Sequence, residues 1–236
     1  MTRIGLSRMG SNPLLMFILV VAIYVVLSIV LGFLRFVVLA AVVDPPGAWL
    51  LELTGHLLNL VAVIVVASTI ARQRLSMRVF CGPQMNASLL FIVLGGVLLG
   101  AFSHWISSFI SSYSVRILPG LSSVNNAQSG IIGMTKTPAG FVAMFLSVCA
   151  LAPLSEEILL RGFGFRTLRT RYGIFGSTGI IGLVASAMHI YPVLMPDVFV
   201  FNVLACICFE LSGDIWLSFT VHATTNCISL LRLIYG

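Results

Sequence analysis

The stretch LLMFILVVAIYVVLSIVLGFLRFVVLAAVV, from Leu14 to Val43, decides the class of fold because it is almost wholly apolar and carries one charge, Arg35. A helix of about 20 apolar residues crosses the hydrocarbon core of a bilayer, and this run is longer. It is also about twice as long as the apolar core of a signal peptide, and no small-residue cleavage site with a polar start follows it. The run therefore predicts a membrane-spanning helix rather than a cleaved leader.

The composition extends this prediction to the whole chain. Of its 236 residues 59% are hydrophobic and 8% are charged, whereas charged residues make up about a quarter of a soluble domain. The net charge of +6 does not indicate a nucleic-acid partner, because the basic residues lie beside apolar runs, where they act as orientation signals. The five cysteines lie mostly inside apolar runs and predict free thiols rather than disulfides. We expect an integral membrane protein in contact with lipid.

Further apolar runs divide the rest of the chain. The turn DPPG at 44–47 ends the first run, since proline cannot continue a helix. The later runs cover residues 48–71, 87–110, 139–160, 174–191, 198–211 and 215–234. Because the last three are short, we predict an all-α polytopic transmembrane helical bundle of about seven membrane segments, within a range of six to eight. Without an internal repeat or low-complexity segment, residues 1–236 are expected to form a single integral membrane domain.

Basic residues cluster in alternate connections between the apolar runs. One side holds the clusters around Arg3, Arg72 and Arg166, while the other holds only Arg116 and Lys136 in its longest connection. Since arginine and lysine favour the cytoplasmic side, we expect the N-terminus in the cytoplasm. The expected location is the cytoplasmic (inner) membrane of a bacterium.

Ionisable side chains within apolar runs need a reason, because a charge at the centre of a bilayer costs a few kcal/mol. The strongest group is SEEILLR at 155–161, shortly after Pro153. We expect Pro153 to break the fourth run and Ser155 to cap a new helix that starts near Glu156.

The two glutamates of this group face different directions on a helix. Glu157 and Arg161 are four residues apart and are expected to pair. Glu156 lies about 100° around the helix from Glu157 and remains free to act as a general base.

Two later groups complete the set of candidates: His189, and His222 with Asn226. The four-residue spacing of His222 and Asn226 places imidazole and carboxamide on one helical face. A hairpin that turns near Tyr172-Gly173 would bring Glu156 and His189 level. Taken singly, each group also fits a solvated helix start, a packing histidine or a hydrogen bond between helices. Their convergence at one place would favour a reactive site.

The pattern resembles the CAAX protease and bacteriocin-processing (CPBP/ABI) family of intramembrane endopeptidases, which includes the type II CAAX prenyl endopeptidases. The resemblance rests on Glu-Glu-x-x-x-Arg at 156–161, on His189 and on His-x-x-x-Asn at 222–226. It covers residues 139–230, which would carry the catalytic core. Where the family usually has phenylalanine, four residues before its histidine, this chain has Ala185, a difference that concerns the shape of the pocket.

The resemblance implies a role for each matched side chain. Glu156 and His189 would activate a water molecule, and His222 and Asn226 would stabilise the tetrahedral oxyanion. Glu157 and Arg161 would hold their helix in place. The substrate would be a peptide or a membrane-protein segment at the bilayer.

A zinc-dependent mechanism is the alternative to this scheme. One glutamate and two histidines form a familiar catalytic zinc set, and here that set would be Glu156, His189 and His222. The sequence has no HExxH motif, and asparagine is a weak zinc ligand, so we prefer a mechanism without metal and leave the cofactor open.

Two other functions remain open. Buried glutamate and histidine also mark ion pathways, so a small transporter or proton-coupled carrier is possible, although we find no inverted repeat. A non-catalytic immunity or binding member of the same family is the other alternative. The presence of all matched catalytic residues favours the peptidase.

Overall fold

The computed structural model describes residues 12–41, 48–70, 88–117, 131–189 and 194–236, and these ranges contain helices without β-strands. The elements are α1 (Pro13–Ala41), α2 (Ala48–Ile70), α4 (Leu89–Ile117), α6 (Pro138–Leu146), η4 (Ser147–Leu151), α7 (Ala152–Glu157), η5 (Ile158–Phe165), α8 (Arg166–Met188), α9 (Met195–Ser212) and α10 (Trp216–Tyr235). The predicted all-α helical bundle is confirmed.

Five stretches of the described residues are long and apolar enough to cross a membrane, namely Pro13–Leu34, Ala48–Thr69, Leu89–Ile117, Pro138–Met188 and Met195–Ser212. The fourth reverses direction at Gly173, whose φ is 66°, a value that favours glycine. When the two arms of this fourth stretch are counted separately and α10 is added, the described residues contain seven helical segments. The turn predicted at Tyr172-Gly173 is therefore present.

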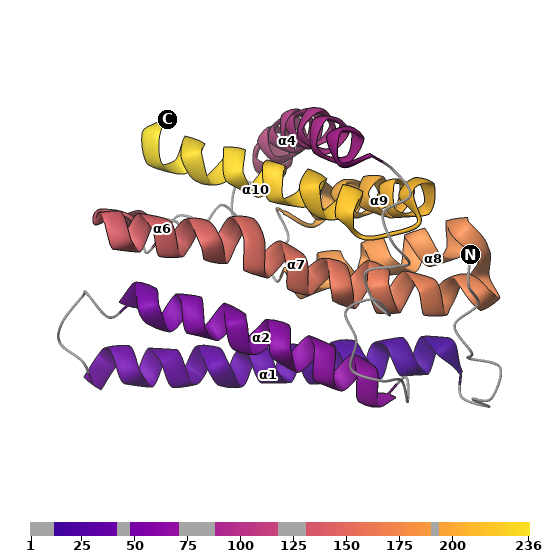
Figure 1. Ribbon diagram of the computed structural model, residues 1–236, viewed down its shortest axis with the longest axis horizontal. Helices are drawn as coiled ribbons and strands as arrows, with labels where there is room; N and C mark the ends of the chain where they lie inside the picture. Colours follow the sequence, from indigo (N-terminus) through magenta and orange to yellow (C-terminus); the bar gives the residue numbers. More distant parts are fainter. Residues whose placement is uncertain (1–11, 42–47, 71–87, 118–130, 190–193) are drawn as a thin grey trace.

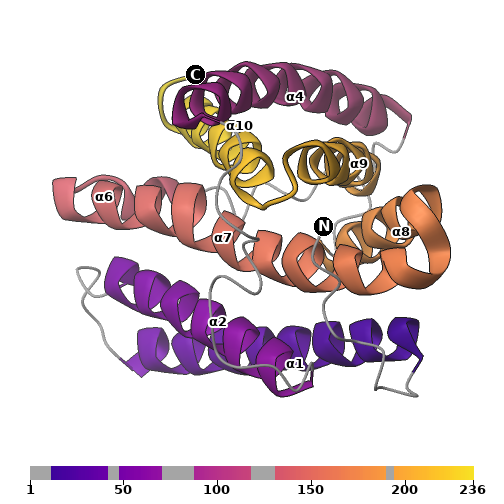
Figure 2. The same cartoon turned by 45° about the vertical axis from the view of Figure 1, so that its right-hand side comes forward.

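The helices form three layers (Figure 1). Helices α1 and α2 lie side by side below. The middle layer holds the long rod from α6 to Gly173 and the returning arm of α8. Helices α9, α10 and α4 lie above, as the rotated view also shows (Figure 2). The core joins Phe17 of α1, Leu159 of η5 and Phe209 of α9, which are all fully buried. Gly164 lets the lower and middle layers meet closely, because a Cβ there would lie 2.4 Å from the Phe17 ring.

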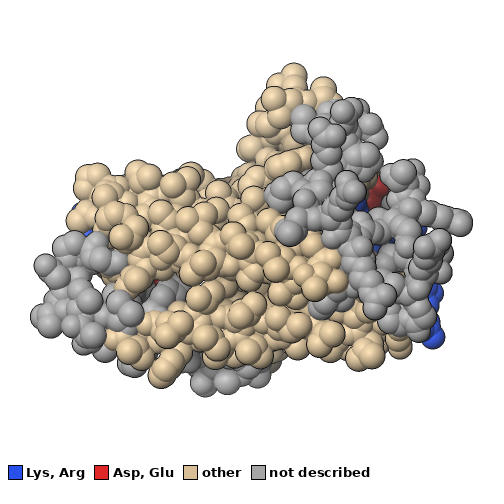
Figure 3. Space-filling view, turned by 60° about the horizontal axis from the view of Figure 1, so that its bottom comes forward, with Lys and Arg blue, Asp and Glu red and all other residues tan. Residues whose placement is uncertain are grey.

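The outer surface is apolar, as a lipid-facing surface requires. On α4 alone, Leu98 and Phe109 are exposed at 71% and 69%. Among the described residues seen in Figure 3, charged side chains gather at the ends of the molecule. Arg166 and Arg171 lie at the end that contains the Gly173 reversal. The clusters around Arg3 and Arg72, on which the predicted orientation also rests, lie outside the described residues.

Two local expectations are wrong. The rod does not break at Pro153, because the π-helical turn η4 directly precedes it and places Pro153 in the first turn of α7. A widened turn accommodates the missing N–H and the proline ring, which would otherwise clash with the preceding turn. Ser155 therefore caps no helix start, and its hydroxyl instead donates to the Ala152 carbonyl at 2.8 Å.

The third helix is longer than its apolar run. It continues through the serines after residue 110 and ends at Ile117. Ser112 shows why this is possible, because its hydroxyl donates to the Ser108 carbonyl at 2.7 Å within the helix. A polar run in this chain thus remains helical.

Candidate active site

A cavity of about 130 Å³ lies where α4, α7, α8, α9 and α10 meet, and the four predicted catalytic side chains line it. Glu156, His189, His222 and Asn226 come from three separate segments of the chain. Other described residues that line the cavity include Ser107, Asp197, Phe201, Asn202, Thr225 and Ser229. The structure therefore brings together the residues that the sequence analysis placed on one site.

Glu157 lies beneath the cavity and is fully buried. Its Oε1 accepts a hydrogen bond from the Arg161 guanidinium at 3.0 Å, and both side chains are 0% exposed. The predicted pair is confirmed. Arg161 also donates to the carbonyl of Asn202 at 3.3 Å, which ties the middle layer to α9.

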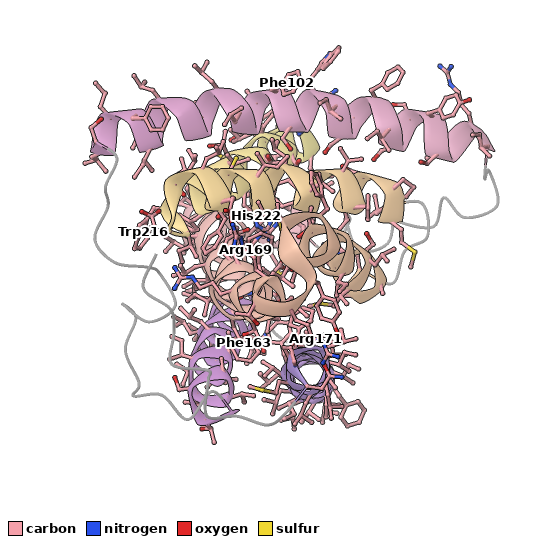
Figure 4. The ribbon with its side chains drawn as sticks, turned by 90° about the vertical axis from the view of Figure 1, so that its right-hand side faces the viewer. Phe102, Phe163, Arg169, Arg171, Trp216 and His222 are labelled. Carbon is pink, nitrogen blue, oxygen red and sulfur yellow. The ribbon has the colours of Figure 1, made fainter. Side chains whose placement is uncertain are left out.

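Glu157 makes a second contact that the sequence analysis missed. Its Oε1 lies 3.1 Å from Nδ1 of His222. Because a carboxylate only accepts, Nδ1 carries the hydrogen and Nε2 is left for the cavity. His222 is buried in the upper layer beneath α4 (Figure 4).

Glu156 lies on the other side of this imidazole. Its Oε2 is 3.9 Å from Nε2 of His222, and the glutamate side chain is 24% exposed. That separation is too long for a hydrogen bond, but a polar gap of this size suits a bridging water. The two adjacent glutamates thus have distinct surroundings, one in the interior and one at the cavity.

His189 is held by the backbone at the end of α8. Its Nδ1 lies 2.9 Å from the Ala185 carbonyl, so Nδ1 donates and Nε2 remains an acceptor. Ala185, which replaces the family's usual phenylalanine, is 1% exposed and packs in the core.

Asn226 connects α10 to the π-helical turn. Its Nδ2 donates to the Val148 carbonyl at 3.0 Å, which leaves the second N–H of the amide available. The turn that accommodates Pro153 thus also fixes Asn226.

The arrangement does not fit the alternative zinc set. In the described part of the chain, no three histidine, cysteine, aspartate or glutamate side chains come together as a metal-binding group. Glu156, His189 and His222 line one cavity without forming such a group.

Asp197 is a further lining residue that the sequence analysis did not identify. It lies in the first turn of α9, shortly after His189. The signal that would have found it is an acid at the start of an apolar run, close in sequence to a candidate catalytic residue.

Comparison with protein-family models matches residues 138–228 to the family described as type II CAAX prenyl endopeptidase Rce1-like. Comparisons with curated proteins and with solved structures found no match. The matched segment contains all four predicted catalytic residues, whereas α1, α2 and α4 lie outside it. The family implies peptidase activity on a peptide or protein, and its match together with the apolar helices indicates an integral membrane protein. Residues 138–228 of this protein therefore resemble the Rce1-like family of type II CAAX prenyl endopeptidases.

Proposed function

We propose that the protein is an intramembrane endopeptidase that hydrolyses a peptide bond in a membrane-associated peptide or protein. The single observation that carries the proposal is the cavity lined by Glu156, His189, His222 and Asn226. A structural role for each residue alone would not require the four side chains to face one cavity.

In the proposed first step, Glu156 takes up one proton of a water molecule as its oxygen attacks the peptide carbonyl, and His189 accepts a hydrogen bond from the same water. Glu156 suits this role because its carboxylate lines the cavity, with Oε2 3.9 Å from Nε2 of His222. His189 suits its role because the Ala185 carbonyl holds Nδ1–H and leaves Nε2 as the acceptor. The same proton then passes to the leaving amine.

The negative charge that develops on the carbonyl oxygen would be stabilised by His222 and Asn226. With Nδ1–H bound to Glu157, a protonated Nε2 of His222 points a second N–H toward the cavity. The free N–H of Asn226 supplies the other donor. Fixed donors of this kind stabilise a transition state because they need no reorganisation during the reaction.

Glu157 and Arg161 are proposed as supporting residues. Arg161 balances the charge of Glu157 in the interior, where either ion alone would be strongly unfavourable. Glu157 in turn orients the His222 imidazole through its contact with Nδ1.

The wider assignment is part of the same proposal. Residues 1–236 form one membrane domain with the catalytic core in 139–230. The N-terminus lies on the cytoplasmic side of a bacterial inner membrane.

Peptide hydrolysis by the purified protein in detergent tests the assignment. Glu156→Ala and His222→Ala are expected to abolish cleavage. Their matched controls are Glu52→Ala and His56→Ala, which alter an acid and a histidine that pair on α2 at 3.3 Å, and these controls should keep activity. Equal hydrolysis by the wild type and both cavity variants would refute the proposal.

The same assay tests the metal alternative. Chelator is expected to leave the rate unchanged. Loss of activity that added zinc restores would overturn the metal-free mechanism.

A further inference from the structure

Helix α4 lies outside the family-matched segment, yet it forms one wall of the cavity through Ser107. Figure 4 shows it lying across the top of the bundle, with Phe102 on its outer side and His222 beneath it. The site is therefore built partly by an element that the family motifs do not include.

Two glycines set how closely α4 packs on α10. A Cβ at Gly96 or Gly100 would lie 2.5 Å from the Cβ of Thr220 or Thr224, respectively. The contact is also fixed along the helix axis, because the Thr225 hydroxyl donates to the Gly100 carbonyl at 3.1 Å. Any larger side chain would push the two helices apart.

This packing brings two serines of α4 to the start of α9. Ser107 and Ser111 are four residues apart and share a face of the helix. The Ser111 hydroxyl donates to Oδ2 of Asp197 at 3.3 Å, and Ser107 lies within reach of the same carboxylate. Asp197 is thereby held at the cavity wall, on which Glu156 and His189 also lie.

No permanent cation among the described residues pairs with the carboxylate of Asp197. Among the described residues that line the cavity, none is lysine or arginine, and the ion pairs found in the described ranges do not include Asp197. The bases that interact with it are His189 and His104, and an imidazole is charged only when protonated. The helix dipole favours an acid in the first turn of α9, but this does not account for the contact with α4 or for the position in the cavity.

We infer that Asp197 is a specificity-determining residue that binds the basic side chain of a lysine or arginine next to the scissile bond. The inference rests on the proposed endopeptidase function, and it adds the class of substrate. An endopeptidase cuts away from the chain ends, so the cationic group is a side chain rather than a terminal amine. A half-buried carboxylate held by hydroxyl groups suits such a cation, because charge-assisted hydrogen bonds are stronger than neutral ones.

The test uses one apolar host peptide in which each position in turn carries Lys, Gln or Glu. For the wild type we expect cleavage beside Lys about tenfold faster than with Gln at the same position, a ratio equivalent to roughly 1.4 kcal/mol. Glu should slow cleavage further. In Asp197→Asn the ratio of cleavage rates with Lys and with Gln should fall to about one. In Ser111→Ala this ratio should lie between that of Asp197→Asn and that of the wild type. Glu52→Gln removes the same charge from α2 and should keep the wild-type ratio.

A binding measurement separates this inference from the catalytic one. The labelled Lys, Gln and Glu peptides are titrated into the inactive Glu156→Ala protein and into its Asp197→Asn double variant. Hydrolysis by the wild type without a Lys preference would overturn the role of Asp197 and leave the peptidase standing. A Lys preference in binding that needs Asp197, together with no hydrolysis by the wild type, would support the subsite and overturn the peptidase. A Lys preference that persists in both Asp197→Asn proteins would also overturn the role of Asp197.

Discussion

Glu157 contacts both Arg161 and His222 in the interior. Variants of this contact can therefore separate the contribution of Glu157 to stability from its contribution to catalysis. Glu157→Gln keeps the shape of the side chain and its acceptor oxygen but removes the charge. Arg161, which is 0% exposed, then remains as an uncompensated cation in the interior, and His222 loses its anionic partner.

The expected loss of stability is large. Breaking a buried ion pair by removing one partner costs about 3–5 kcal/mol, which corresponds to a fall in Tm of roughly 10 °C for a chain of this size. Glu157→Gln/Arg161→Met removes both charges, so most of this stability should return. Catalysis should not return, because His222 still lacks its anionic partner. We expect kcat to be at least about 100-fold below wild type in both variants, as for the loss of an oxyanion donor.

Tryptophan fluorescence during heating in detergent measures Tm, and peptide hydrolysis measures kcat. The matched control is Glu210→Gln, which breaks the pair of Glu210 with Arg169. These side chains are 21% and 29% exposed, with one contact at 2.7 Å. A partly exposed pair contributes about 1 kcal/mol or less, so this variant should melt near wild type and stay active.

Two results would refute the reasoning. If the double variant recovers wild-type kcat, Glu157 does not act through His222. If Glu157→Gln melts at the wild-type temperature, the buried pair does not stabilise the bundle.

Three further changes test other contacts. Asn226→Ala should lower kcat about 100-fold with little change in KM, and an equal rate would remove Asn226 from the oxyanion site. Gly100→Val should lower Tm and weaken the Lys preference, because it separates α4 from α10. Gly32→Ala should do neither, because no atom lies within 4 Å of its new Cβ. Equal Tm values for the wild type and both variants would contradict the packing argument. Gly173→Ala should lower Tm, because a φ of 66° with a ψ of −169° is a conformation that costs a non-glycine residue about 1–3 kcal/mol. Gly179→Ala in the same helix should raise Tm slightly. The reverse order would argue against the turn at Gly173.

Features that depend on local sequence were predictable. The ends of α1 and α2 lie within two residues of their apolar runs, because prolines and polar turns end a lipid-facing helix. The pairing of Glu157 with Arg161 followed from helical spacing alone. The turn at Gly173 and the facing pair of His222 and Asn226 followed from the same geometry.

Features that depend on packing between distant segments were not predictable. The contact between Glu157 and His222 joins residues 65 positions apart, and no helical period relates them. Asp197 lies in the cavity wall beside Ser111 of α4, a contact between residues 86 positions apart. Pro153 was misread because its usual effect on a helix assumes that the preceding turn is a regular α-helix.

The π-helical turn at Ser147–Leu151 also acts as a phase shift in the rod. It holds one more residue than a normal turn, and each residue advances an α-helix by about 100°. Side chains before it, such as Phe141, and after it, such as Glu156, therefore do not follow one common helical wheel. A single helical wheel drawn through Pro153 therefore places the side chains of one half of the rod on the wrong face. Removing one residue from this turn would rotate both glutamates away from their present neighbours while leaving their spacing in the motif intact.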